Sequence, residues 1–197
     1  MPDLDILALA AHRDDVEQTC GGTLLKAAQS GQRTGILDLT RGEMGTRGDA
    51  DARAREADAA AKILRVSYRH ALDLPDGRVE NTFVNKLKVA RVLREQRPRV
   101  LILPYWQGRH PDHYTASTLG YEATFLAGLT KLGSTPATAD IPAAEELLAL
   151  KPHRPFKIVY ASLYYDVRPT FVVDITEHFD DKVRSLLAYD SQYSDQA

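Results

Sequence analysis

The sequence predicts a layered α/β fold in which a mostly parallel sheet lies between helices. Three short runs, residues 6–10, 34–39 and 99–104, are almost continuously apolar, which is typical of central strands that are covered on both faces. Segments with apolar residues at helical spacing separate these runs. Strands that alternate with helices along a chain form βαβ units, and such units build a parallel sheet.

The individual elements follow in chain order. Residues 22–30 come after a glycine pair and end before Gly31, so they predict a helix. The alanine-rich residues 50–65 and the residues 81–96, which end shortly before Pro98, predict two more helices. The other expected elements are a weaker strand at 67–74, a helix at 116–129, a loop at 133–142, strands at 156–165 and 170–175, and a last helix at 178–189.

Length and composition indicate one soluble globular domain over residues 1–197. Of the 197 residues, 44% are hydrophobic and 26% are charged, and a chain of this length can bury its own core. The formal net charge of −2 gives no general attraction for nucleic acid or anionic lipid, so neither is an expected partner. We expect no membrane helix, since no apolar stretch approaches ~20 residues. A single cysteine, Cys20, and no recognisable secretory signal favour the cytoplasm.

Histidines and acids follow two of the three strongest predicted strands. The stretch "AHRDD" comes directly after the first strand, and "GRHPDHYTAS" comes after the strand at 99–104. The carboxyl ends of parallel strands share one edge of the sheet, where ligands bind. His12, Asp15 and His113 would then supply three N and O ligands, as in catalytic zinc sites that leave a fourth position open. Either loop alone is more often an ordinary turn, but the two together favour a metal site.

Residues beside these ligands are candidates for the chemistry. Asp14 stands between two of the ligands and could take a proton from a metal-activated water. His110 could act as a cation or acid beside a developing oxyanion, with Asp112 fixing its tautomer. Arg109 is a candidate for binding an acidic part of the substrate, because guanidinium groups bind carboxylates bidentately.

Several other residues have two interpretations from the sequence alone. Arg53 could reach the substrate or form an i,i+3 ion pair with Glu56 on a solvated helix face. Glu43 could meet a sugar hydroxyl or cap its own glycine-rich loop. Cys20 is more simply a small buried residue than a thiol of lowered pKa. Tyr105 and Trp106 could form an aromatic wall for a sugar or could pack at the core or at an interface.

The motifs "AHRDDVE", "TRGEMGTRG", "LPDG" and "RHPDH" resemble those of the PIG-L/LmbE-like family of zinc-dependent N-acetylglucosaminyl deacetylases, most closely its bacillithiol-biosynthesis branch. The resemblance implies a Rossmann-like three-layer αβα sandwich, one zinc per chain, and deacetylation of an amino sugar, with N-acetylglucosaminyl malate as a candidate substrate. By position it places His12, Asp15 and His113 on the zinc ligands, Asp14 on the general base, His110 and Asp112 on the oxyanion-stabilising histidine and its partner, and Arg53 on a sugar-binding arginine.

The sequence departs from that family in two places. Arg13 stands where the family has proline, and we expect it to point to solvent, since arginine is mostly exposed. Relatives in the branch also continue for several tens of residues beyond this C-terminus.

The resemblance implies trimers that pair into hexamers, and an excess of apolar and aromatic side chains also favours a homo-oligomer. These residues are Tyr105, Trp106, Tyr121, Phe125 and Leu126.

Two alternatives to an active deacetylase remain from the sequence. A Rossmann-type nucleotide-binding domain needs a G-x-G-x-x-G cradle in its first βα turn, whereas this turn carries two acids that would repel a pyrophosphate. A catalytically impaired homologue would keep the fold and the metal but lack activity, because of Arg13 or the shorter C-terminus.

Overall fold

The computed structural model describes residues 4–134, 138, 141–163 and 165–194. Within them the chain forms a five-stranded sheet of order β3-β2-β1-β4-β5, and every neighbouring pair is parallel. The strands are β1 (Ile6–Ala10), β2 (Thr34–Thr40), β3 (Tyr68–Leu74), β4 (Val100–Pro104) and β5 (Lys157–Ala161). The helices are α1 (Asp15–Thr19), α2 (Gly21–Gln29), α3 (Ala50–Ile63), α4 (Phe83–Gln96), α5 (Pro111–Ala127), α6 (Pro142–Glu145), the 3₁₀ turn η1 (Thr176–His178), α7 (Phe179–Leu187) and α8 (Asp190–Tyr193).

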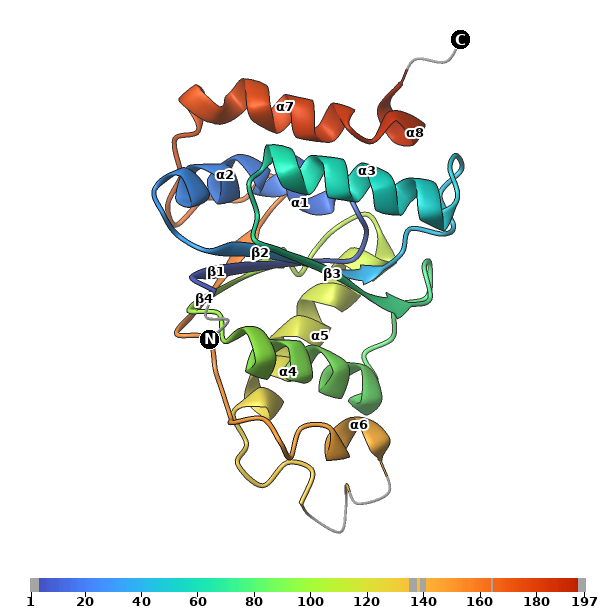
Figure 1. The fold of residues 1–197 in the computed structure, drawn as a ribbon, viewed down its shortest axis with the longest axis vertical. Helices are drawn as coiled ribbons and strands as arrows, with labels where there is room; N and C mark the ends of the chain where they lie inside the picture. The colour runs from blue at the N-terminus through green and yellow to red at the C-terminus, as the bar shows by residue number, and fades with distance from the viewer. Residues whose placement is uncertain (1–3, 135–137, 139–140, 164, 195–197) are drawn as a thin grey trace.

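Helices cover both faces of the sheet, as the sequence predicts. Helices α1, α2 and α3 lie on one face and α4 and α5 on the other, while α7 and α8 lie outside the first group (Figure 1). The predicted layered α/β architecture with a parallel sheet is therefore confirmed. None of the described helices is both long and apolar enough to cross a membrane.

The pleat of β1 explains the two layers of core. Leu7 and Leu9 belong to the large core shared with α4 and α5, whereas Ala8 and Ala10 face Val16 and the α1–α2 side. Successive residues of a strand point to opposite faces, so bulky side chains fill one layer and small ones let α1 approach the other. Strand β2 is buried along its whole length, which explains its continuous apolar pattern.

Helix α5 lies close against β4 because of a glycine. A Cβ placed on Gly120 would come within 2.5 Å of the Leu103 side chain, a separation that real contacts do not show. Helix α5 begins with Pro111 at its first position and with His110 as its N-cap, which is a favoured arrangement. The helix thus starts earlier than the predicted residue 116, and it carries His113 in its first turn.

Several predicted bounds near the C-terminus are wrong. The strand expected at 156–165 is shorter, and the apolar run at 170–175 forms no strand. That run connects the β5 edge to α7, with Ile175 packed on Gly22 of α2 and the Lys26 ammonium donating to the Asp174 carbonyl. Phe171 and Val172 remain exposed. The last expected helix, at 178–189, matches α7, and the short α8 follows it. Part of the loop expected at 133–142 lies outside the described residues.

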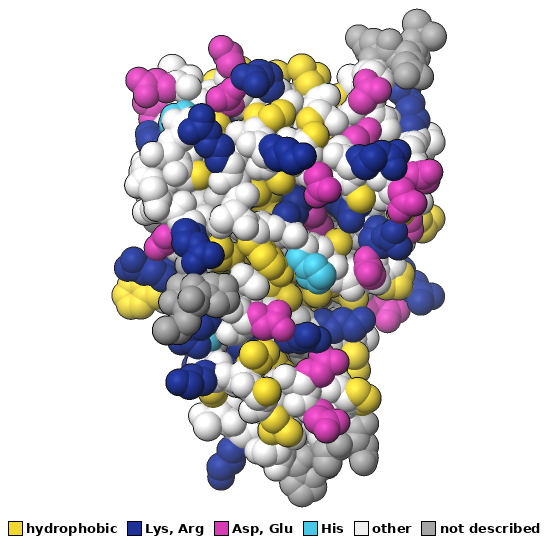
Figure 2. Space-filling model, in the orientation of Figure 1, with side chains coloured by type: hydrophobic (Ala, Val, Ile, Leu, Met, Phe, Trp, Pro, Cys, Tyr) yellow, Lys and Arg dark blue, Asp and Glu magenta, His cyan; other side chains and the backbone are white. Residues whose placement is uncertain are grey.

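The strand order fixes where a ligand can bind. The chain adds strands outward from β1 through β2 to β3, and then returns to place β4 on the other side of β1. In such sheets the loops after the two strands at the reversal diverge and leave a crevice at their carboxyl ends. Here the first of these loops carries His12, and the second leads into the first turn of α5, which carries His113. On the face seen in Figure 2, basic and acidic side chains are intermixed.

Candidate metal centre

The turn between β1 and α1 brings His12 and Asp15 together. Asp14, the N-cap of α1, has φ of 105°, a conformation that is uncommon outside glycine and that aspartate tolerates better than most residues. The Asp15 carboxylate accepts a hydrogen bond from the His12 backbone N–H at 2.9 Å. Left-handed residues of this kind are concentrated at functional sites, and this one lies in the turn that carries His12 and Asp15.

Two imidazole nitrogens and the two oxygens of one carboxylate lie close together at the sheet edge. His12 Nδ1 lies 3.2 Å from His113 Nε2, His113 Nε2 lies 3.2 Å from Asp15 Oδ1, and His12 Nδ1 lies 3.5 Å from Asp15 Oδ2. Ligand atoms about 2.0–2.2 Å from one tetrahedral ion are roughly 3.3–3.6 Å apart. The donor set and its spacing therefore fit a divalent metal such as zinc.

Two carboxylates lie against the other nitrogen of His12. Its Nε2 is 3.0 Å from Asp76 Oδ1 and 3.2 Å from Asp112 Oδ2. Metal-binding histidines commonly donate their second N–H to a carboxylate, which orients the ring. Burial alone would lower the pKa of His12. Asp15 and Asp76 outweigh burial, both through their hydrogen bonds with His12 and through their negative charges, and raise the pKa to about 10.

The same contacts act on the acids. Burial alone would raise the pKa of Asp15, but the hydrogen bonds from His113 and His12 outweigh it and hold that pKa below its ordinary value. The hydrogen bond from His12 likewise lowers the pKa of Asp76. These carboxylates are thus ionised, which is the form that binds or supports a metal.

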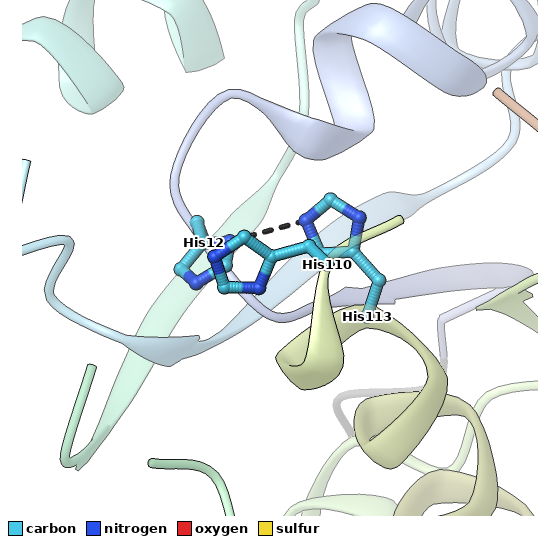
Figure 3. Close-up of side chains that lie close together, drawn as sticks. All are labelled: His12, His110 and His113. Carbon is cyan, nitrogen blue, oxygen red and sulfur yellow. Dashed lines mark hydrogen bonds between the residues drawn. The ribbon is translucent and has the colours of Figure 1, made fainter. Parts of the chain in front are cut away.

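His110 completes a group of three imidazoles. Its ring stacks on His113 with centroids 5.0 Å apart and meets His12 edge-on at 4.7 Å (Figure 3). Nitrogen atoms of the three rings lie close enough to share a metal, as do donor atoms of His12, Asp76 and Asp112. The His12–Asp15–His113 set is distinguished from these two by combining two imidazoles with a buried carboxylate.

The contact between Asp112 and His110 is made by the backbone. His110 Nδ1 accepts the Asp112 backbone N–H at 3.2 Å, whereas the Asp112 carboxylate accepts the N–H groups of Gly77 at 2.8 Å and Val79 at 3.1 Å. The predicted pairing of the Asp112 carboxylate with His110 is therefore replaced by one with His12. Burial, with the charges of His12 and His113, lowers the pKa of His110, so the neutral ring keeps its proton on Nε2.

Asp14 has the surroundings of a weak base. Its carboxylate lies 3.5 Å from Arg53 Nη2 and accepts a hydrogen bond from the Tyr193 hydroxyl at 3.0 Å. Burial, together with the charge of Asp15, raises the pKa of Asp14 to about 7 against the opposing charge of Arg53. A carboxylate with this pKa can both take and return a proton near neutral pH.

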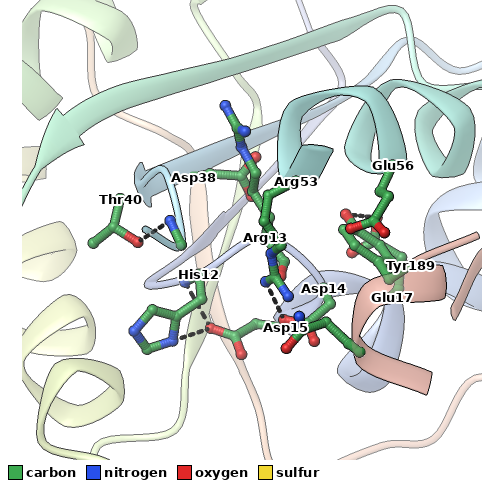
Figure 4. A network of polar contacts seen from close by, with 12 residues as sticks. His12, Arg13, Asp14, Asp15, Glu17, Asp38, Thr40, Arg53, Glu56 and Tyr189 are labelled. Atoms are coloured by element: carbon green, nitrogen blue, oxygen red, sulfur yellow. Dashed lines mark hydrogen bonds and ion pairs between the residues drawn. The ribbon is translucent and has the colours of Figure 1, made fainter. Parts of the chain in front are cut away.

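Arg53 is buried beside Asp14 and not paired with Glu56. Its guanidinium donates to the Arg13 carbonyl and lies 5.4 Å from the ring of Tyr189, and the side chain is almost fully buried. The Glu56 carboxylate instead accepts two hydrogen bonds from Ser191, one from its backbone N–H at 2.7 Å and one from its hydroxyl at 2.8 Å. Figure 4 shows Arg53 directed toward Asp14.

The expectation that Arg13 points to solvent is wrong. Its side chain is 9% exposed, and its guanidinium donates to the Ala50 carbonyl at 3.1 Å. Burial raises the pKa of the Asp38 carboxyl group, and the positive charge of Arg13 acts, with a smaller effect, to lower it. A buried acid and a carbonyl at the start of α3 thus draw the arginine inward, where it cannot meet an acidic substrate.

The other two predicted substrate-binding residues, Glu43 and Arg109, both lie at the surface. Glu43 accepts the Asp76 N–H at 2.8 Å and the Arg41 N–H at 3.2 Å, so its contacts are those of a loop cap that ties residues 41–49 to the turn after β3. Arg109 is exposed next to His110. The rings of Tyr105 and Trp106 lie 4.1 Å apart at a tilt of 32°, and Trp106 also meets Tyr160 edge-on at 4.8 Å, so the three rings form an aromatic cluster beyond β4.

Sequence reasoning missed two residues that contact the site. Asp76 lies in the "LPDG" turn after β3, whereas polar site residues were expected only after β1, β2 and β4. The aspartate–glycine turn at the same sheet edge was a usable signal. Tyr193 comes from α8 near the end of the described chain, and no local pattern links it to Asp14.

The fold and the donor set define an α/β enzyme with a candidate metal centre at the sheet edge, and comparisons place it in a family. The profile of PIG-L, GlcNAc-PI de-N-acetylase, matches residues 7–124. Diacetylchitobiose deacetylase of Thermococcus kodakarensis is 32% identical over 199 residues, covering 95% of this chain and 70% of that protein. The chain belongs to the PIG-L family. The predicted resemblance is confirmed at the level of the family.

Two further relatives show how far the similarity extends. The crystal structure of the conserved protein TT1542 from Thermus thermophilus matches with a TM-score of 0.84 and 39% identity, covering 95% of this chain and 79% of that one. The 4-oxalmesaconate hydratase of Pseudomonas putida is 27% identical, over 94% of this chain and 72% of its own length. Relatives that share the fold thus include a deacetylase and a hydratase, so the reaction must be argued from the site.

Proposed function

We propose that the protein is a zinc-dependent hydrolase that removes the N-acetyl group from a small N-acetylglucosamine-containing substrate. The observation that carries this proposal is the pairwise proximity of His12 Nδ1, His113 Nε2 and the Asp15 carboxylate, with Asp14 next in sequence to Asp15. A zinc ion bound there would polarise the acetamide carbonyl and lower the pKa of a water molecule.

The chain's own residues then divide the reaction between them. Asp14 takes a proton from the water while the water oxygen adds to the carbonyl carbon. Asp14 then returns this proton to the amide nitrogen as the C–N bond breaks. His110 donates its Nε2–H to the carbonyl oxygen, which gains negative charge in that step. Arg53 holds Asp14, while Asp112 and Asp76 orient His12. The products are acetate and a free amine.

The substrate proposal extends to an acidic aglycone. Arg109 is exposed beside His110, and a guanidinium binds a carboxylate bidentately. N-acetylglucosaminyl malate, the substrate suggested by the bacillithiol-biosynthesis branch, carries such carboxylates. Glu43 would act on the sugar through the loop that it caps, and Arg53, which is almost fully buried, would act through Asp14.

A homo-oligomer built on a trimer is part of the same proposal. Tyr121 and Phe125 are 56% and 58% exposed on α5, and with Phe83 and Ile158 they line a shallow groove. Exposed apolar patches of this kind often mark interfaces, and closed symmetry is the usual outcome for soluble homo-oligomers. Light scattering that gave a mass near 21.9 kDa would contradict it.

The test combines metal analysis of the purified chain with an amine-release assay on a panel of N-acetylglucosaminides that includes the malate. We expect bound zinc and release of one amine per acetate formed. Bound zinc without amine release from any member would indicate an impaired homologue. The absence of both, with binding of a nucleotide, would overturn the proposal in favour of a nucleotide-binding domain.

A further inference from the structure

A small apolar pocket opens directly beside the candidate metal ligands. It lies at the carboxyl ends of β1, β4 and β5, and Asp15 and His113 form part of its wall. The rest of the wall is largely apolar. Its main members are Val16, Cys20, Ile102, Tyr105, Ala161 and Leu163. The mechanism proposed above gives this pocket no role.

The strand order divides the surroundings of His12 into two unlike sides. The polar groups Glu43, Arg53 and Asp76 follow β2 and β3, on one side of β1, and Figure 4 shows Arg53 directed toward Asp14. The pocket lies on the other side, toward β4 and β5. A trans amide likewise places its two substituents on opposite sides of the C–N bond.

We propose that this pocket binds the acyl group of the substrate and sets the length of acyl chain that the enzyme accepts. The inference rests on the proposed function, since the carbonyl must lie at the His12–Asp15–His113 centre for the acyl carbon to enter the pocket. The hydroxyl-rich sugar then faces the polar loops after β2 and β3, and the hydrocarbon faces apolar side chains, where its burial is favourable.

The dimensions of the pocket limit the acyl chain to two or three carbons. The cavity has a volume of about 40 Å³, and one water molecule occupies roughly 10–15 Å³ on this scale. It therefore has room for about three small groups. Val16 and Cys20 are both buried, and Cys20 carries no charge at neutral pH, because burial raises its pKa to about 12. Val16 and Cys20 therefore present an uncharged, largely apolar surface to the acyl chain.

The first test compares N-formyl, N-acetyl, N-propionyl, N-butyryl and N-hexanoyl glucosamine as substrates of the zinc-loaded protein. We expect the highest kcat/KM for acetyl, a similar or modestly lower value for propionyl, and a value lower by roughly tenfold or more for hexanoyl, the scale that hydrophobic pockets achieve. A value of kcat/KM that is independent of acyl length would overturn the pocket assignment and leave the deacetylase proposal standing.

Two variants change the pocket in opposite directions. Ala161→Leu fills it from the end of β5, and we expect it to lower kcat/KM for propionyl and acetyl while sparing formyl. Leu163→Ala, at a partly exposed position, opens it, and we expect the preference to move toward butyryl. Leu187→Ala, at a position 59% exposed on α7, is the matched control. Identical acyl preferences in the parent and both pocket variants would contradict the assignment.

A second readout does not depend on turnover. Saturation-transfer NMR on the methyl protons of acetate, propionate, butyrate and hexanoate measures binding to the protein with zinc present. We expect short carboxylates to bind, hexanoate to bind at least several-fold more weakly, and Ala161→Leu to weaken propionate. If the carboxylates bound in this order but no amide were cleaved, the acyl-binding role of the pocket would be supported and the proposed hydrolase activity would be overturned. Failure of all carboxylates to bind would overturn the pocket.

Discussion

Two buried clusters of polar side chains meet at helix α1, and they differ in how their charge is balanced. The site cluster consists of His12, Asp15, Asp76, Asp112 and His113. The support cluster consists of Glu17, Asp38, Arg69 and Tyr189. Asp15 and Glu17 are only two positions apart, and residues at this spacing in a helix point in different directions.

The support cluster contains its own cation. Arg69 binds Asp38 bidentately at 2.9 and 3.2 Å and lies 2.6 Å from Glu17, and the Tyr189 hydroxyl donates to Glu17 at 3.0 Å. The site cluster is different, because within the described residues its ion pairs join carboxylates only to imidazoles. Imidazoles balance the acids only by taking up protons. One cluster therefore holds a permanent cation, although Glu17 Oε2 is buried without a hydrogen-bond partner in the part of the chain that the structure describes, while the other has the composition of a site for an added cation.

The largest expected effect comes from breaking the site cluster at Asp15. Asp15→Asn removes the charge of one of three ligands and should reduce zinc to a negligible fraction per chain, since three protein ligands are the minimum for such a site. Elemental analysis after dialysis measures this. Glu17→Gln is the matched control two residues away and should keep its zinc. Equal zinc in the two variants would erase the distinction between the clusters.

The next effect separates chemistry from metal binding. Asp14→Asn removes a base and leaves the three ligands untouched, so zinc content should stay at the parent value while kcat falls by ~10²–10⁴-fold. Single-turnover amine release with metal analysis of the same sample provides both values. A variant that retains near-normal turnover would show that another group takes the proton.

The third prediction concerns the contribution of the support cluster to the free energy of unfolding. Arg69→Gln leaves the buried carboxylates of Glu17 and Asp38 without their ion-pair partner and should lower the free energy of unfolding by ~3–5 kcal/mol, measured by urea titration. Glu95→Gln, which breaks an exposed i,i+4 pair with Arg91 on α4, should cost at most about 1 kcal/mol. Equal losses in the two variants would mean that the support cluster is not a stabilising unit.

A smaller effect should follow from loosening the support of His12. Asp76→Asn weakens the acceptor for His12 Nε2 and should lower zinc affinity by about 10–100-fold, measured by competition with a chelator. Asp73→Asn is the control three residues earlier, where the carboxylate is 69% exposed and lies 3.7 Å from Arg41. If both variants bound zinc like the parent, Asp76 would be a loop residue and not a partner of His12.

The smallest effect concerns Cys20, which follows α1 and closes the pocket. Burial raises its pKa from 9.0 to about 12, so the folded state favours the protonated thiol. The stability that this supplies is fully present below pH 9 and is lost as the pH rises toward 12. At pH 8 a thiol reagent should label the native protein far more slowly than the denatured protein. Rapid native labelling would place the thiol at the surface.

Much of the fold could be predicted from the sequence because local pattern and tertiary environment agree there. The apolar runs of β1, β2 and β4 and the helical spacing of α3 and α4 match the structure closely. The run at 170–175 has the same apolar pattern but finds no neighbouring strand among the described residues. A pattern can indicate that a segment prefers a sheet, but it cannot supply the partner.

In the site, too, some contacts could be predicted from the sequence and others depend on distant neighbours. His12, Asp15 and His113 could be predicted to meet, because parallel strands bring the ends of β1 and β4 to one edge. The inward turn of Arg13 could not, because it depends on a buried acid from β2 and a carbonyl from α3. The contact of Asp112 with His12 rather than with the nearby His110 also depends on where the turn after β3 falls.

Diffraction at the zinc absorption edge from crystals grown with zinc tests the central claim most directly, namely that the site cluster takes one added cation. The account predicts a single anomalous peak per chain, about 2.0–2.2 Å from His12 Nδ1, His113 Nε2 and one oxygen of Asp15. A peak bound by the three histidines with Asp15 turned away, or no peak at saturating zinc, would contradict it.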